Sequence, residues 1–232
     1  MKKLVVIPTY KESENIDKLI KKIWKLPINK VDILVIDDSP DDKTKQKIKL
    51  LQQEEPNLNL IDRSSKLGLS SAYIRGFQWG LKRDYDLFIQ MDGDLSHSPE
   101  YLSDMIKSAR NNNVVVGSRY AGGDVKNWDK FRNFISWAGN SYARMILGMN
   151  IRDMTSGFCL WNKDVLESLS LEKIYSDGYS FQVEMKYRAT KNNFSISETP
   201  IVFKGREEGQ SKMSKKIFFE AVWMMWWLKL NV

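Results

Sequence analysis

In the first half of the chain, short apolar runs rich in β-branched residues alternate with segments in which apolar side chains recur every three to four residues. The runs have the length and composition of buried strands, and they cover residues 4–7, 31–36, 58–61, 87–91 and 114–116. The periodic segments, clearest at residues 16–26 and 102–109, predict amphipathic helices. This order predicts an α/β fold: a mostly parallel sheet with helices on both faces and functional groups at the carboxyl ends of its strands.

The second half is less regular. Its pattern predicts helices at residues 131–147 and 179–190 and strands at residues 157–161 and 195–203. No linker rich in proline, glycine or serine separates the halves, so we expect one domain over residues 1–214, followed by a C-terminal segment over residues 215–232. Residues 204–212 combine turn residues with charge and lack periodicity, which predicts a mobile surface loop.

The C-terminal segment is strongly apolar. Residues 217–228 contain Glu220 as their one charged residue, together with Trp223, Trp226 and Trp227. As a helix they would be about 18 Å long, shorter than the ~30 Å hydrocarbon core of a membrane. Tryptophans with flanking lysines suit a helix in the headgroup region of a membrane. A helix buried against the sheet fits the same pattern, and both interpretations stay open.

Composition narrows the class of protein. Hydrophobic residues make up 42% and charged residues 28%, which is typical of a globular protein and not of a disordered one. We expect neither a membrane-spanning helix nor a secretory leader, because no run approaches ~20 apolar residues. A single cysteine, Cys159, fits a reducing compartment and excludes a zinc cluster built on cysteines. The net charge of +7 favours polyanionic partners without choosing among them.

Acidic and polar clusters follow three of the predicted strands. They occupy residues 8–12, 37–42 and 92–97. In a parallel sheet these strand ends line one crevice, so the clusters should converge. Asp92 and Asp94 flank Gly93, and such paired carboxylates bind Mg²⁺ or Mn²⁺ while leaving positions open for phosphate oxygens. An isolated Asp-x-Asp is also common as an acidic turn, and the two companion clusters favour the functional interpretation. His97 is interpreted as a turn or helix-start residue.

An ordered set of motifs runs from Leu4 to about Met213. It comprises Pro8-Thr9-Tyr10-x-Glu12-x-x-Asn15, Ile36-Asp37-Asp38-Ser39-Pro40-Asp41, Lys66-x-Gly68-Leu69, Met91-Asp92-Gly93-Asp94-Leu95-Ser96-His97, Gly117-Ser118-Arg119-Tyr120, Thr155-Ser156-Gly157-Phe158, Gly178-Tyr179-x-Phe181-Gln182-x-Glu184 and Gly209-x-Ser211-Lys212. With this set the chain resembles the dolichyl/polyprenyl-phosphate mannosyltransferases of glycosyltransferase family 2. Those enzymes are inverting, use nucleotide sugars and have a GT-A fold.

The resemblance implies a function. Residues 1–214 would be a catalytic domain that transfers mannose from GDP-mannose to a polyprenyl phosphate, with Mg²⁺ or Mn²⁺ as cofactor. The protein would lie peripherally at the cytoplasmic face of a membrane, and a membrane-spanning partner subunit is compatible with this arrangement. The nearest alternative keeps the fold and the lipid acceptor but uses UDP-glucose or another nucleotide sugar.

The resemblance also implies residue roles. The nucleotide sugar would be held by Pro8, Tyr10, Glu12, Val35, Asp37, Asp38, Asp92, Gly93, Arg206 and Lys212. The metal would be held by Asp92, Asp94 and Ser96. The catalytic set would be Asp94 with Arg119, Arg132 and Ser136, of which the last three match positions that bind the acceptor phosphate.

The chemistry of a phosphate acceptor agrees with this set. A phosphate monoester, with a second pKa near ~6, is largely dianionic at neutral pH, so the site needs cations to place the nucleophile and no base to create it. We expect one in-line displacement with inversion, in which the metal and Lys212 or Arg206 stabilise the leaving diphosphate.

Two other classes fit less well. A nucleic-acid-binding module would suit the positive charge, but the acidic strand ends would repel a phosphate backbone and no recognised motif is present, so we expect no nucleic-acid partner. A dinucleotide-binding dehydrogenase would need Gly-x-Gly-x-x-Gly after the first strand, where this chain has Pro8-Thr9-Tyr10.

Overall fold

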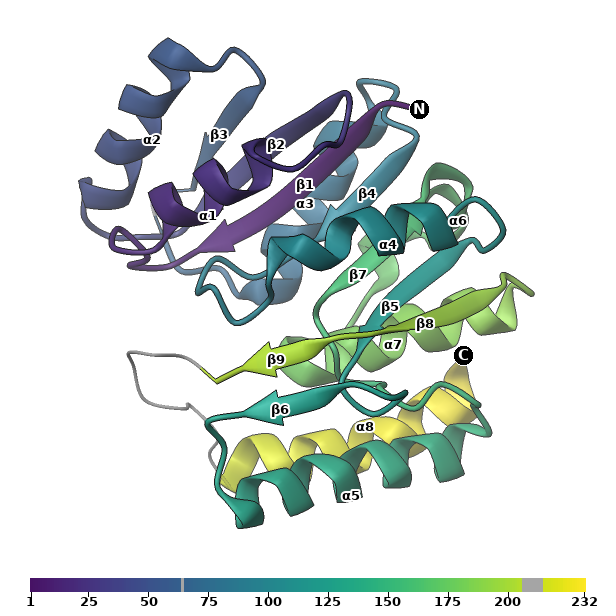
Figure 1. Ribbon diagram of the computed structural model, residues 1–232. Helices are drawn as coiled ribbons and strands as arrows, with labels where there is room; N and C mark the ends of the chain where they lie inside the picture. The colour runs from purple at the N-terminus through teal and green to yellow at the C-terminus, as the bar shows by residue number, and fades with distance from the viewer. Residues whose placement is uncertain (64, 206–214) are drawn as a thin grey trace.

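The computed structural model describes residues 1–63, 65–205 and 215–232, with side chains omitted for residues 215–221. Strands and helices alternate through the first half (Figure 1). They are β1 (Lys3–Thr9), α1 (Ile16–Trp24), β2 (Val31–Asp37), α2 (Lys43–Glu54), β3 (Leu58–Asp62), α3 (Leu69–Leu81), β4 (Leu87–Gln90), the short 3-10 helix η1 (Pro99–Tyr101), α4 (Leu102–Ser108) and β5 (Val114–Ser118). The second half consists of β6 (Asp124–Lys126), α5 (Lys130–Leu147), β7 (Cys159–Asn162), α6 (Lys163–Ser168), η2 (Leu171–Lys173), α7 (Gly178–Lys191), β8 (Ile196–Pro200), β9 (Val202–Lys204) and α8 (Lys215–Asn231).

The described strands form one seven-stranded sheet and one two-stranded sheet. The order in the large sheet is β3-β2-β1-β4-β7-β5-β8, and β6 pairs with β9 in the small one. Every pairing is parallel except those of β7, which runs antiparallel to both β4 and β5. The carboxyl ends of β1, β2, β4 and β5 therefore share one edge of the sheet with the beginning of β7.

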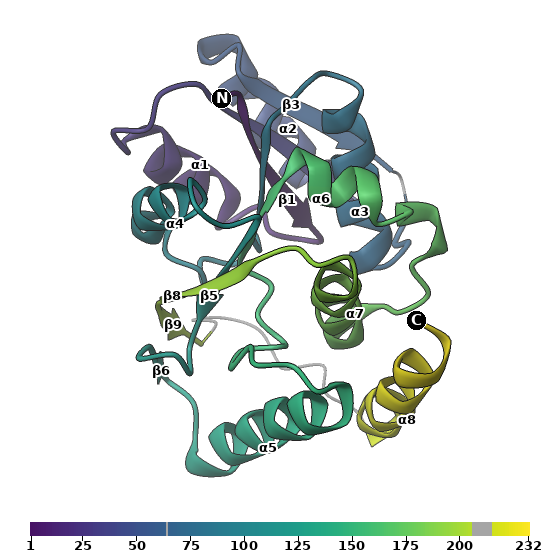
Figure 2. The same cartoon turned by 90° about the vertical axis from the view of Figure 1, so that its right-hand side faces the viewer.

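Helices cover both faces of the large sheet (Figure 2). Because successive side chains of a strand point to opposite faces, Val5 and Ile7 of β1 pack with α1, α2 and α4, whereas Leu4 and Val6 pack with α3, α6 and α7. All four of these β1 side chains are fully buried. The continuous apolar runs of the sequence are thus explained by a sheet that is covered on both sides.

A third apolar cluster joins α5 and α8, which lie side by side (Figure 1), to α7. On α8, Met225 and Leu228 are buried in this cluster, and Tyr142 of α5 donates a hydrogen bond to the Val222 carbonyl at 3.2 Å. The opposite side of α8 exposes Trp223 and Trp226. One side of the C-terminal helix is therefore buried against the domain, and the other side faces outward.

The predicted α/β fold is confirmed, including the five strands of the first half. The expected single strand at residues 195–203 is wrong, because the chain leaves the large sheet after Pro200 and continues as β9 beside β6. Pro200 has no N–H to donate to a ladder. Ile201 is the crossover residue, because its N–H donates to the Ser118 carbonyl of β5 at 3.0 Å and its carbonyl accepts from the Asp124 N–H of β6 at 3.0 Å. Of the predicted loop at 204–212, Lys204 belongs to β9 and Gly205 is buried, while the remainder lies outside the described residues.

Two helical glycines test the packing of the helices. A Cβ at Gly76 of α3 would lie 2.4 Å from Cγ1 of Val6, so Gly76→Ala should lower the free energy of unfolding by about 1–3 kcal/mol through overpacking. At Gly139 of α5 a Cβ would meet no atom within 4 Å, and Gly139→Ala should raise the free energy of unfolding by about 0.5–1 kcal/mol. Urea denaturation measures both, and an undiminished stability of Gly76→Ala would contradict the close contact of α3 with β1.

Candidate functional site

One edge of the large sheet collects the candidate residues in a row. Asp37 ends β2, Tyr10 follows β1, and Asp92 follows β4. Next along the edge comes Gly157, which precedes β7, and then Arg119, which follows β5. The order of the strands therefore places the predicted nucleotide residues at one end of the row, the predicted metal residues in the middle and the predicted acceptor residues at the other end.

At the nucleotide end, Asp37 is fully buried with one carboxylate oxygen satisfied. Its Oδ1 accepts hydrogen bonds from the hydroxyls of Thr9 at 2.9 Å and Ser39 at 2.7 Å. Its Oδ2 is buried and has no hydrogen-bond partner among the described residues. Because a buried acceptor without a donor is costly, this oxygen fits a ligand N–H such as that of a nucleotide base.

Asp38 has a different environment. Its two oxygens accept from Nε and Nη2 of Arg63, each at 2.6 Å, and Arg63 also donates to Ser71 Oγ at 2.7 Å. A forked pair of this kind fixes geometry as well as charge. Asp38 therefore ties the end of β2 to the loop before α3, and its predicted contact with base or ribose stays a prediction.

The other predicted nucleotide residues surround the same end of the row. The Tyr10 ring has Lys66 Nζ at 4.7 Å and Lys11 Nζ at 5.6 Å from its centroid. Glu12 accepts a hydrogen bond from Asn15 at 3.1 Å. Val35 is fully buried in the core, so only its backbone is available to a ligand. Pro8 lies within β1, and Arg206 and Lys212 lie outside the described residues.

Asp92 is held in place from two sides. The Tyr73 hydroxyl donates to Asp92 Oδ1 at 2.8 Å, and burial together with the Asp92 charge raises the pKa of Tyr73 well above its usual value, so the phenol keeps its proton. The Asp92 backbone N–H donates to Nδ1 of His97 at 3.3 Å. Burial lowers the pKa of His97, against the opposing effect of Asp92, and the accepting Nδ1 belongs to a neutral ring. His97 thus braces the turn, as predicted, and leaves the Asp92 charge uncompensated.

Asp94 closes the turn that follows Gly93. Its Oδ1 accepts from the backbone N–H of Ser96 at 3.1 Å and from the Ser96 hydroxyl at 2.5 Å. Leu95 between them has a φ of 62°, the left-handed conformation that such a turn requires. Ser96 is buried and holds the Asp94 carboxylate in position through these two hydrogen bonds. Its predicted role as a metal ligand stays a prediction.

The chemistry of the donor set fits a hard divalent cation. Among the described residues no lysine or arginine forms an ion pair with Asp92, and the carboxylate is partly exposed. The same residues contain no group of three or more acidic, histidine or cysteine side chains that could hold an ion by themselves. Asp92 and Asp94 therefore suit Mg²⁺ or Mn²⁺ completed by phosphate oxygens and water, the usual arrangement for these ions at nucleotides.

At the far end of the row, Arg119 forms a buried ion pair with Asp153. Nε and Nη2 of Arg119 donate to the two carboxylate oxygens at 2.8 and 2.6 Å, and Nη2 also donates to Thr155 Oγ1 at 2.8 Å. Burial disfavours the charged form of both side chains, but the attraction between the two charges outweighs burial. The pKa of Arg119 is therefore raised above its usual value, and the pKa of Asp153 is lowered. The guanidinium is therefore charged and fixed in orientation.

Aromatic side chains lie between Arg119 and the other two predicted acceptor residues, Arg132 and Ser136. The Arg132 guanidinium lies 4.2 Å from the ring centroid of Trp128, and that of Arg119 lies 5.7 Å from the same centroid. Ser136 accepts a hydrogen bond from the Tyr120 hydroxyl at 2.7 Å. Trp128 and Tyr120 thus connect Arg119 to residues of α5 that are distant from it in sequence.

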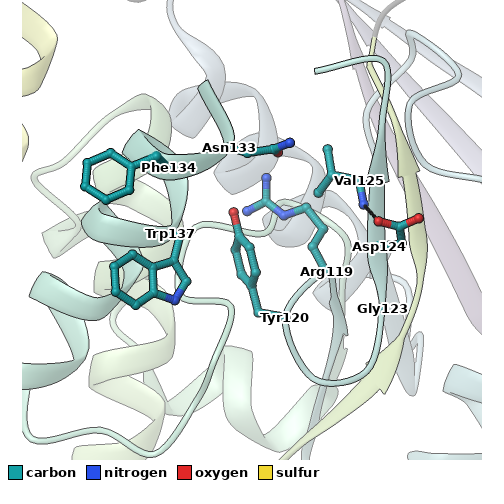
Figure 3. A pocket seen from close by; sticks show the side chains of 8 residues that line it. All are labelled: Arg119, Tyr120, Gly123, Asp124, Val125, Asn133, Phe134 and Trp137. Carbon is teal, nitrogen blue, oxygen red and sulfur yellow. Dashed lines mark hydrogen bonds between the residues drawn. The ribbon is translucent and has the colours of Figure 1, made fainter. Parts of the chain in front are cut away.

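Beside Arg119 lies a cavity of about 390 Å³ (Figure 3). Its lining consists of Arg119, Tyr120, Gly123, Asp124, Val125, Asn133, Phe134 and Trp137. The figure shows the Arg119 guanidinium next to the Asn133 amide, with the Phe134 and Trp137 rings together on the α5 side. A cavity with a cationic part and an aromatic part suits a ligand that is anionic at one end and apolar at the other.

Comparison with known proteins assigns the chain to a family. Residues 4–170 match the family described as glycosyl transferase family 2. The chain belongs to this family. Among curated relatives, it is 41% identical to the undecaprenyl-phosphate mannosyltransferase of Micrococcus luteus, over 96% of this chain and 91% of the relative. It is 40% identical to the polyprenol monophosphomannose synthase of Mycolicibacterium smegmatis, over 94% of this chain and 83% of the relative.

More distant proteins share the fold. The dolichol-phosphate mannosyltransferase of Pyrococcus furiosus is 36% identical over 95% of this chain, which spans 61% of that relative. Glucosyl-3-phosphoglycerate synthase from Mycobacterium tuberculosis, solved with Mn²⁺, UDP-glucose and phosphoglyceric acid, superposes with a TM-score of 0.68 at 17% identity, covering all of this chain and 80% of that one. The family resemblance and the GT-A fold expected from the motifs are confirmed.

Several residues that shape the site were not predicted from the sequence. Asp153 orients Arg119, Tyr73 holds Asp92, and Arg63 engages Asp38. Asp153 lies two residues before the Thr155-Ser156-Gly157 motif, and this proximity was the available signal. Tyr73 and Arg63 lie outside the motifs found in the sequence, so no local signal marked them.

The ion pair at Arg119 can be tested by removing one charge. Asp153→Asn keeps the side-chain shape but leaves the buried guanidinium without a counter-charge, and breaking such a pair should cost about 3–5 kcal/mol of the free energy of unfolding. Asp84→Asn, which breaks an exposed pair with Lys163, serves as the matched control and should unfold like the wild type. Equal urea midpoints for the two variants would contradict the structural role of Asp153.

Proposed function

We propose that this family 2 enzyme transfers mannose from GDP-mannose to a polyprenyl monophosphate, with inversion, to give polyprenyl-phosphate mannose and GDP. The observation that supports the proposal is the order of the strands, which brings the Asp92 and Asp94 carboxylates to the same sheet edge as Arg119, with Arg132 on the other side of a shared contact with Trp128. The relatives named as mannosyltransferases of polyprenyl-phosphate lipids, 40–41% identical over nearly the whole chain, supply the sugar and the acceptor class.

On the donor side, the free oxygen of Asp37 would accept from the base, and Asp92 with Asp94 would hold Mg²⁺ or Mn²⁺ against the diphosphate. When bound, the metal would neutralise the charge that develops on the leaving group. Tyr73 would keep Asp92 oriented while the ligand enters. Arg206 and Lys212 are assigned to the same diphosphate from the family motif alone.

On the acceptor side, the phosphate would lie in the cavity at Arg119. The guanidinium is already charged and oriented by Asp153, so it would bind the phosphate dianion without reorganising. Arg132 and the Ser136 hydroxyl would add further contacts. Because the dianion is itself the nucleophile, these residues place it for in-line attack and no side chain has to remove a proton.

The experiment that tests this function is a transfer assay with GDP-[¹⁴C]mannose and polyprenyl phosphate, followed by organic extraction of the label. We expect label in the organic phase with Mg²⁺ or Mn²⁺, and a decrease of at least ~100-fold with EDTA, because the leaving diphosphate then lacks its counter-charge. UDP-[¹⁴C]glucose in place of GDP-mannose is the control donor. Transfer from UDP-glucose and not from GDP-mannose would overturn the assignment of GDP-mannose as the donor. Undiminished transfer in EDTA would overturn the assignment of a divalent metal as the cofactor.

We also propose that the enzyme lies peripherally at the cytoplasmic face of a membrane, through α5 and α8. Large apolar side chains are exposed on their outer surfaces: Phe131, Phe134, Trp137 and Met145 on α5, and Trp223, Trp226 and Leu230 on α8. Phe134 and Trp137 also line the cavity, so this apolar face adjoins the acceptor site. None of the described helices is long and apolar enough to cross a membrane. Tryptophans with exposed Lys130 and Lys229 suit the headgroup region.

Charged substitutions on this face should release the protein from lipid. We expect the double variant Phe131→Glu with Trp226→Glu to bind phosphatidylcholine/phosphatidylglycerol vesicles at least ~100-fold more weakly, because each large apolar side chain contributes ~1.5–3 kcal/mol on burial. Leu50→Glu, an exposed apolar position on α2, is the control and should co-sediment with vesicles like the wild type. Identical sedimentation of the double variant would exclude the α5 and α8 face as the lipid contact.

A further inference from the structure

Gly157 lies between Asp92 and Arg119 along the sheet edge, and two polar groups border the space beside it. A Cβ added to Gly157 would lie 3.5 Å from Nε2 of Gln182 and 3.6 Å from Oδ2 of Asp92. These are ordinary contact distances, so the glycine is not required to avoid a clash. Its missing side chain instead leaves a space of about one methyl group that has an amide on one side and a carboxylate on the other.

The orientation of the Gln182 amide follows from a buried relay of hydrogen bonds. The indole N–H of Trp161 can only donate, and it donates to Gln90 Oε1 at 3.1 Å. Gln90 must therefore present its NH₂ group to Gln182, whose Oε1 accepts at 2.6 Å. The NH₂ group of Gln182 is consequently the part of the amide that faces Gly157. Trp161, on β7, thus sets the direction of both amides, which would otherwise be interchangeable.

The segment that precedes Gly157 is anchored by α7, the helix that carries Gln182. Lys186, one turn further along α7, is fully buried and donates to the carbonyls of Met154 at 3.0 Å and Ser156 at 2.8 Å. Its ammonium group also donates to the Gln182 carbonyl, at 3.2 Å. Gly157 and the Gln182 amide are therefore held at a fixed distance from each other.

We propose that Gln182 is a substrate-binding residue whose NH₂ group donates a hydrogen bond to a hydroxyl of the transferred sugar, seated over Gly157. This inference rests on the proposed function. The sugar must lie between the leaving diphosphate at Asp92 and the acceptor phosphate at Arg119, and Gly157 occupies that place in the row. A hydroxyl both donates and accepts, so it complements an accepting carboxylate beside a donating amide.

The test separates the sugar from the nucleotide. In Gln182→Met the side chain keeps a similar length but loses its donor. We expect the Kd of GDP, measured by calorimetry with Mn²⁺, to stay within twofold of the wild type. The Kd of GDP-mannose, or its kcat/KM in transfer, should be at least tenfold worse. Gln52→Met on α2, which removes the amide that donates to the Leu58 carbonyl of β3, is the matched control and should change neither value.

Gly157→Ala provides an independent variant that should fold normally. Its methyl group fits at contact distance, so we expect an unchanged melting temperature and unchanged GDP binding with a tenfold or greater loss in kcat/KM for GDP-mannose. Equal losses for GDP and GDP-mannose in Gln182→Met, or no loss in either variant, would overturn the assignment of Gln182.

The proposed function fails separately. Wild-type enzyme that forms no mannosyl lipid would overturn that function whatever the variants show. The ratio of the Kd values for GDP and GDP-mannose still tests Gln182 in that case, because it requires binding and not transfer. A ratio in Gln182→Met equal to that of the wild type would overturn only the inference about Gln182.

Discussion

The arrangement of the site depends on the direction of one strand. β7 lies between β4 and β5 and runs antiparallel to both, so its beginning, and not its end, reaches the edge where the parallel strands finish. The segment before β7 therefore fills the gap between Asp92 and Arg119. A parallel strand in this place would bring its own carboxyl-end loop to the edge, and the residues at 153–157 would lie at the opposite end of the sheet.

The charges along this edge suit the proposed transfer between two phosphates. At the proposed donor end Asp92 has a neutral histidine and a protonated tyrosine as neighbours, which leaves its negative charge available to a cation. At the proposed acceptor end the Arg119 charge is preserved by Asp153 in spite of burial. Preorganised charges of this kind need not rearrange during reaction, which is the main way in which enzymes stabilise charged transition states.

Much of the fold could be predicted because the sheet is covered on both faces. Each buried strand is then a continuous apolar run, as in Leu4 to Ile7, and is readable without its neighbours. The division of residues 195–203 into β8 and β9 depends on pairing with β5 and β6, which local sequence does not encode.

The residues of the site could likewise be predicted only in part. Asp92, Asp94 and Arg119 were predicted, since they lie in motifs at strand ends. Their supporting residues were not, because Tyr73 and Asp153 act across the fold on partners distant in sequence. The Gln90 to Gln182 bond joins residues 92 positions apart, and its direction is set by Trp161. Only the folded structure shows such a relay.

A crystal structure with Mn²⁺ and GDP-mannose, in the absence of acceptor, tests most directly whether donor and acceptor meet across Gly157. We predict an anomalous manganese signal at Asp92 and Asp94, with the mannose ring over Gly157 and its anomeric carbon facing the cavity at Arg119. A manganese signal away from both aspartates, or a mannose ring on the side of β4 that faces β1, would contradict it.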